Sequence, residues 1–162
     1  MKAKKFMILV VICILLVIQL AGCSQEKFSA NQISPLDKNK ITMMIISSGN
    51  SVTKEFDDKE QIKTLLENMD VIRFSKISIN QEEEVLDKGK KFNVDTTFVL
   101  QLLETKHGAP KATIVVISDK ELILTDRETM EKTRTVSYMN QSDETSLNAV
   151  KEIYTLAKKA MD

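Results

Sequence analysis

Ser51 and Lys54 are spaced as S-x-x-K, the arrangement in which a lysine can activate a serine nucleophile for acyl transfer. That chemistry needs both side chains on one face of a helix. Here the pair straddles an expected turn and an expected strand, and neither S-D-N nor K-T-G, the partner motifs of such enzymes, occurs in the sequence. We therefore expect no catalytic serine in this protein.

Metal and acid–base chemistry have equally little support in the sequence. His107 is the single histidine, and it lies in an expected Gly-Pro turn without a neighbouring nucleophile. The acidic run 82–84 offers carboxylates to Ca²⁺ but lacks the spaced acids and the glycine of a calcium loop. Asp57 and Asp58 are explained by a helix start. We expect no catalytic residue, no metal and no cofactor.

Composition excludes several other classes of binding. Lys plus Arg and Asp plus Glu both number 23, so there is no surplus of positive charge to neutralise nucleic-acid phosphates. Four glycines leave little room for a phosphate-binding loop. Six Phe, two Tyr and no Trp are too few for a platform on which bases stack. Nucleic acid is therefore not an expected partner.

The first 22 residues have the pattern of a secretory signal. Three lysines within residues 1–5 precede an apolar run of 15 residues, 6–20, interrupted only by Gln19. This run is short for a transmembrane helix, which needs about 20 apolar residues, although an uncleaved anchor remains the alternative.

The residues that end this run, Leu20-Ala21-Gly22-Cys23, resemble the lipobox of bacterial lipoproteins. The resemblance implies that a diacylglyceryl group is attached to the Cys23 thiol. It also implies that signal peptidase II recognises Leu20, Ala21 and Gly22 and cleaves before Cys23. Two acyl chains on one residue would satisfy the two-signal requirement for stable membrane anchoring. The expected location is the extracytoplasmic side of the cell membrane.

Processing changes the charge and the cysteine count. Removal of residues 1–22 takes away three lysines and no acid, which leaves a net charge of −3. Cys13 is discarded with the signal and Cys23 carries lipid, so no disulfide is expected. We interpret the polar residues 23–40 as the lipidated cysteine and a flexible tether. Ile33 and Leu36 within it are apolar enough to dock on the domain.

Residues 41–162 are expected to form one α+β domain. Apolar runs and alternating apolar and polar residues predict strands. Apolar residues spaced i, i+3, i+4 predict a helix from Asp57 to Met69, which Asp57 and Glu60 begin with the spacing of a capping box. A final helix is expected to begin with Ser142 as its cap. Residues 80–91 read as a charged loop. The expected strands are 41–47, 52–56, 71–79, 92–104, 112–118, 121–125 and 134–139. This ββα, β-meander, α order predicts an antiparallel sheet of five to seven strands with two helices on one face.

The domain loosely resembles small uncharacterised lipoproteins of Gram-positive bacteria, a likeness that implies no activity. With a clear anchor and no catalytic motif, the sequence favours a non-catalytic binding module at the cell envelope, whose partner is another envelope protein. The alternatives are a small-ligand receptor, which needs a concave apolar pocket, and an envelope hydrolase.

The lipobox makes a direct prediction. Cys23→Ala removes the acceptor thiol, so the protein should remain as unprocessed precursor or be shed from membranes, whereas Cys13→Ala should be lipidated normally. Mass spectrometry of the mature amino-terminal peptide measures both the cleavage site and the acyl mass. An unmodified peptide that begins at Met1 in the wild-type protein would contradict the assignment.

Overall fold

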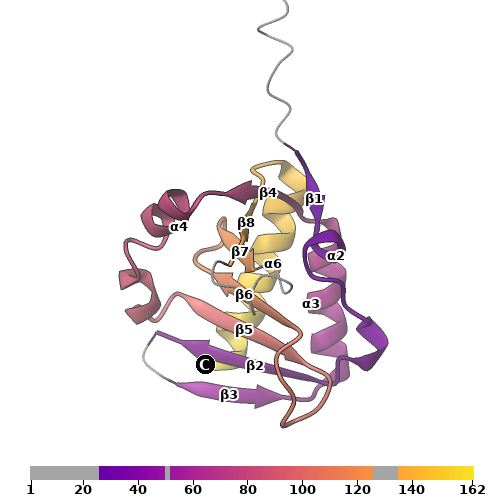
Figure 1. The fold of residues 1–162 in the computed structure, drawn as a ribbon. Coiled ribbons are helices and arrows are strands. Elements are labelled where there is room, and N and C mark those ends of the chain that lie inside the picture. Colours follow the sequence, from indigo (N-terminus) through magenta and orange to yellow (C-terminus); the bar gives the residue numbers. More distant parts are fainter. Residues whose placement is uncertain (1–25, 50–51, 126–134) are drawn as a thin grey trace, which may run out of the picture.

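The computed structural model describes residues 26–49, 52–125 and 135–162. Across these ranges the chain forms one eight-stranded antiparallel sheet and four α-helices (Figure 1). The strands are β1 (Phe28–Ser29), β2 (Met43–Ser48), β3 (Thr53–Phe56), β4 (Arg73–Ile77), β5 (Phe98–Leu103), β6 (Ala112–Val116), β7 (Leu122–Thr125) and β8 (Ser137–Asn140). The helices are α2 (Ala30–Ile33), α3 (Lys59–Val71), α4 (Ile79–Val85) and α6 (Glu144–Met161), with 3₁₀ turns at Lys38–Lys40 and Lys90–Asn93.

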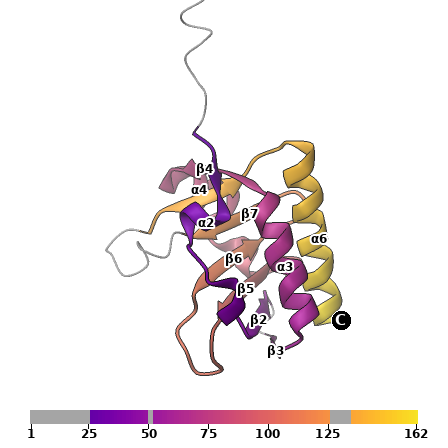
Figure 2. The same ribbon diagram turned by 90° about the vertical axis from the view of Figure 1, so that its right-hand side faces the viewer.

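The strand order is β1-β4-β8-β7-β6-β5-β2-β3, so β5 to β8 form a meander and β1 and β3 are the two edges. Helix α3 carries the chain from the β3 edge to β4, and α6 returns from β8 toward the β3 edge. The two helices lie side by side on one face of the sheet (Figure 2). The α+β class and the C-terminal helix on an antiparallel sheet are thus as the sequence predicts.

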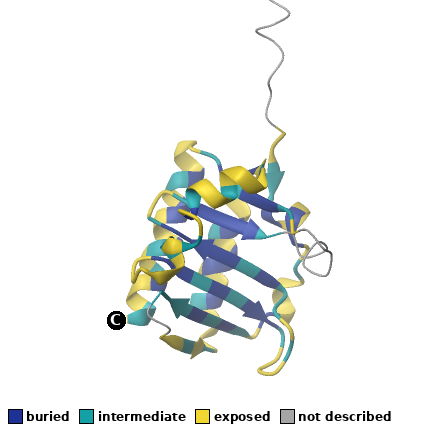
Figure 3. Ribbon diagram, turned by 60° about the vertical axis from the view of Figure 1, so that its left-hand side comes forward, coloured by how far each residue is buried: buried dark blue, intermediate teal, exposed yellow. Residues whose placement is uncertain are grey.

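Alternation along the strands divides the apolar side chains between two faces. Leu100, Ile114 and Leu124 point to the α3–α6 face and are almost fully buried in the main core. Val115 and Ile123 point to the opposite face, where they pack with Leu86, just after α4. β2 and β5 therefore alternate between buried and half-buried residues over most of their length, whereas β6 and β7 are buried almost throughout (Figure 3). Both faces of the meander need cover, and α3, α6 and the α4 segment supply it.

The predicted strand count is too low because the eighth strand comes from residues assigned to the tether. Phe28 pairs with Phe74 of β4, and its ring meets Tyr138 edge-on at 5.1 Å between centroids. Ile33 is buried at 3% exposure, and Leu36 packs on the core. Apolar side chains in this polar segment thus hold it against the sheet.

Residues 80–91, expected as a loop, begin with helix α4. Ser78 and Gln81 form a capping box in which Gln81 N–H donates to Ser78 Oγ at 3.3 Å and Ser78 N–H donates to Gln81 Oε1 at 2.9 Å. Val85 and Leu86 then pack against the sheet. The prediction failed because the helix is short and the apolar residues that it packs against the sheet, Val85 and Leu86, come only at its end, while Ile79 at its start is exposed.

The long strand expected over 92–104 begins at Phe98. Ser48, the last residue of β2, pairs with Phe98, so residues before Phe98 have no neighbouring strand there to bond. The chain instead turns, with Thr97 N–H donating to Val94 O at 3.1 Å. The alternation of apolar and polar residues extends over residues 92–97, where none of the described strands is available to pair, and so it overestimates the length of the strand.

Both predicted helix caps are one residue too early. Asp58, not Asp57, caps α3, and its Oδ1 accepts from Glu60 N–H at 2.9 Å and Gln61 N–H at 3.2 Å. Asp143, not Ser142, caps α6. In each case a carboxylate sits where it can accept from two donors of the first turn.

The α6 cap also joins the helix to the sheet. Ser146 is fully buried, donates its hydroxyl to Asp143 Oδ2 at 2.7 Å and accepts from Arg73 N–H of β4 at 2.9 Å. The Ser146 hydroxyl and backbone N–H both bond the Asp143 carboxylate and hold the pKa of Asp143 below its ordinary value of 3.8.

Asn140 bridges the ends of β7 and β8. Its Oδ1 accepts from Leu122 N–H at 2.7 Å, and its Nδ2 donates to Lys120 O at 3.0 Å and to Gln141 O at 3.2 Å. Asn140 is buried, and its bond to Leu122 N–H is also buried, so water cannot replace the side chain as the partner of that backbone group.

Asn140→Ala should therefore lower the free energy of unfolding by about 2–3 kcal/mol, because the buried Leu122 N–H loses its partner and two further hydrogen bonds are lost. Asn148→Ala, on the exposed side of α6, should change it by less than about 0.5 kcal/mol. Urea denaturation of both variants measures the difference. Equal effects at the two positions would show that the Asn140 side chain contributes nothing particular to the fold.

Candidate functional site

The predicted lipidation and cleavage residues, Cys23 with Leu20, Ala21 and Gly22, lie outside the described residues. Ser51 does too, so the geometry of the S-x-x-K pair is known only from its lysine. In the rest of the chain, none of the helices described is both long and apolar enough to cross a bilayer.

Lys54 is engaged in capping helix α6. Its Nζ donates to Ala160 O at 3.2 Å and to Met161 O at 2.8 Å, the carbonyls that have no partner within the helix. A protonated ammonium held on two carbonyls suits this cap, whereas a general base must be free to accept a proton. The structure thus gives Lys54 a structural position at the end of α6.

The other polar residues considered above lie apart from one another. His107 is exposed in the turn between β5 and β6. Glu82 and Glu83 line a hollow of about 340 Å³ beside Ile79 on α4. Across the part of the chain that is described, no three His, Cys, Asp or Glu residues come close enough to hold a metal ion.

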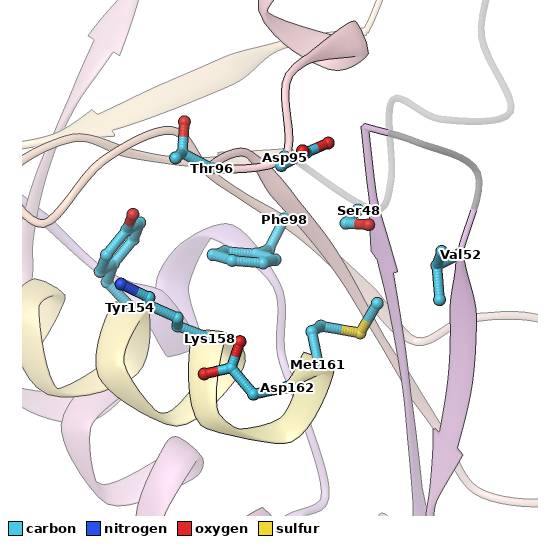
Figure 4. A pocket seen from close by; sticks show the side chains of 9 residues that line it. All are labelled: Ser48, Val52, Asp95, Thr96, Phe98, Tyr154, Lys158, Met161 and Asp162. Carbon is cyan, nitrogen blue, oxygen red and sulfur yellow. The ribbon is translucent and has the colours of Figure 1, made fainter.

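The candidate site is a groove along the C-terminal half of α6, called here the α6 groove. It consists of two adjoining hollows of about 310 and 590 Å³, which share Thr96, Tyr154 and Lys158 (Figure 4 shows the first). One wall is α6, and the other is built from the end of β2, the start of β5 and the loop after β6. Its lining residues are Ser48, Val52, Asp95, Thr96, Phe98, Ile117, Ser118, Asp119, Lys151, Tyr154, Thr155, Lys158, Met161 and Asp162.

The floor of the α6 groove is apolar and fixed. The rings of Phe98 and Tyr154 meet edge-on, with 5.6 Å between centroids and an angle of 61°. Phe98 is only 3% exposed, while Tyr154 is half-buried and borders both hollows. Figure 4 shows Met161 extending from α6 beside Phe98 toward the β2 and β3 strands. Tyr154, held in place by the Phe98 ring, therefore offers a partner an aromatic contact without further ordering.

The rim of the α6 groove carries charges of both signs. The charged residues are exposed: Asp95, Asp119, Asp162, Lys151 and Lys158. Seven ion pairs occur among the described residues, and none includes any of these five. Their charges are therefore available to a bound molecule.

A glycine fixes the loop that carries Asp95 and Thr96. A Cβ on Gly49 would lie 2.3 Å from Val94 O and 2.4 Å from Val94 N, so only glycine permits the β2 end and this loop to meet backbone to backbone. Sequence reasoning missed the groove because its walls are far apart in the chain. The residues in the sequence that could have indicated the groove are Phe98, Tyr154 and Gly49. Each of them is equally expected in a strand, a helix or a turn without a groove.

Comparison with protein-family models, curated proteins and solved structures finds no match to this chain.

Gly49→Ala should force the Val94 backbone away, destabilise the protein by about 1–3 kcal/mol and displace Asp95 from the groove rim. Gly108→Ala is the matched control, because its Cβ would meet chiefly the Thr105 hydroxyl, at 2.8 Å, and this side chain can rotate away. Thermal unfolding measures the first effect, and amide chemical shifts of residues 93–97 measure the second. Unchanged shifts in Gly49→Ala would contradict the close packing.

Proposed function

We propose that the protein is a lipid-anchored extracytoplasmic binding module, and that the α6 groove receives a polypeptide segment of another envelope protein. The anchor is supported by the signal-like residues 1–22 and the lipobox that ends at Cys23. The binding role is supported by the groove. No catalytic step is part of the proposal.

The observation that carries the binding role is the set of unpaired charges on the groove rim. Three acids and two lysines flank an apolar floor, and none of them forms an ion pair among the described residues. A segment with both acidic and basic side chains around an apolar residue complements this pattern. Protein interfaces commonly combine an apolar centre with a polar rim in this way.

A small-ligand receptor is the second candidate, because the two hollows have volumes in the range of ligand pockets. Such pockets bury most of their ligand and are lined mainly by apolar side chains. The α6 groove has five exposed charged residues instead. This lining favours a protein segment over a small molecule.

Photo-crosslinking from the groove tests the proposal. A photoreactive phenylalanine analogue in place of Tyr154 should give a discrete adduct in intact cells, and the crosslinked peptide should carry both acidic and basic residues. The same analogue in place of Thr64, exposed on α3, is the control. Equal labelling from the two positions would contradict a binding role for the groove, and a melting shift with a metabolite alone would favour the receptor.

Lys158→Glu should weaken binding of that crosslinked peptide about tenfold, equivalent to about 1.4 kcal/mol, because an attractive contact becomes repulsive. Lys63→Glu, on α3, makes the same change in net charge outside the groove and should leave affinity unchanged. Calorimetric titration of both variants measures this. If changing an acidic residue of the peptide to lysine restores its binding to Lys158→Glu, that residue is the partner of Lys158. Equal losses of affinity in Lys158→Glu and Lys63→Glu would contradict a specific role for Lys158.

A further inference from the structure

The chain enters the folded domain at the sheet edge farthest from the strands that line the α6 groove. β1 is one edge strand, whereas the groove residues Phe98 and Ser48 belong to β5 and β2, five and six positions along the strand order. Neighbouring strands lie about 4.8 Å apart, so about 24–29 Å of sheet separates β1 from these two strands, and about 19 Å separates it from β6, whose following loop forms the near end of the groove. Figure 1 shows β1 and the C-terminal end of α6 at opposite ends of the domain.

Little chain lies between Cys23 and β1. Phe28, the first residue of β1, follows Cys23 by five residues. Even fully extended, five residues span at most about 17 Å. A lipid on Cys23 would therefore keep the β1 edge within about that distance of the headgroups, while the groove could stand much farther away.

The charge of the domain opposes contact between its far end and the bilayer. After removal of residues 1–22 the net charge is −3, and the groove itself carries three acids against two lysines. Anionic headgroups attract basic clusters and repel such a surface. The groove has no basic cluster that would bring it down to the membrane.

We infer that the domain stands with its β1 edge toward the bilayer and presents the α6 groove outward. This inference rests on the proposed lipid anchor and adds a constraint on the partner. The segment that enters the groove belongs to a secreted protein, or to an ectodomain that extends well beyond the headgroups. A segment confined to the membrane surface cannot reach the site.

Fluorescence quenching can test the orientation, because the lipidated protein has no cysteine besides Cys23. Lys27→Cys beside β1 and Thr155→Cys in the groove each introduce one thiol at an exposed position for a fluorophore. Each lipidated variant is reconstituted in vesicles of phosphatidylglycerol and phosphatidylcholine that contain headgroup-spin-labelled lipid. The probe at 27 should lose most of its fluorescence, and the probe at 155 should keep it.

A longer tether provides the control. Twenty Gly-Ser residues inserted between Gln25 and Glu26 extend the linker to about 25 residues, with a root-mean-square reach of about 27 Å, and should remove the contrast between the two probes. Equal quenching at 27 and 155 in the unextended, lipidated protein would overturn the orientation while leaving the anchor intact. Absence of acyl mass on the amino-terminal peptide would instead overturn the proposed anchor.

Discussion

The fixed position of α6 is the constraint on which the rest of the structure depends. At its start, Ser146 ties the Asp143 cap to Arg73 of β4, and at its end Lys54 of β3 bonds the last carbonyls. Between these points Val150, Ile153 and Ala157 are fully buried against the sheet. The helix is therefore attached to strands near both edges, and the groove wall that it forms is rigid for the same reason.

Several charged side chains of the domain are engaged at helix ends. Lys54 satisfies a helix end, Asp58 and Asp143 satisfy helix starts, and each is used by backbone groups that need a partner. Five exposed charged residues that form no ion pair among the described residues lie together on the rim of the α6 groove. An apolar floor with charges around it is an arrangement suited to recognition of another molecule.

Much of the fold could be predicted from the sequence because hydrophobic periodicity reports burial directly. The stripe on α3 and the apolar runs of β2 and β6 are examples. Two misses arose where one long-range contact decides the local structure: Phe28 becomes a strand only because β4 is beside it, and β5 starts where β2 ends. The groove could not be predicted, since only the topology brings Asp95 to Lys158.

The outer edge of β3 has a consequence for self-association. β3 lies at one end of the strand order and carries two charged residues, Lys54 and Glu55. Charged residues on an edge strand are a common protection against pairing with another strand. The charged β3 edge therefore disfavours edge-to-edge pairing between two domains.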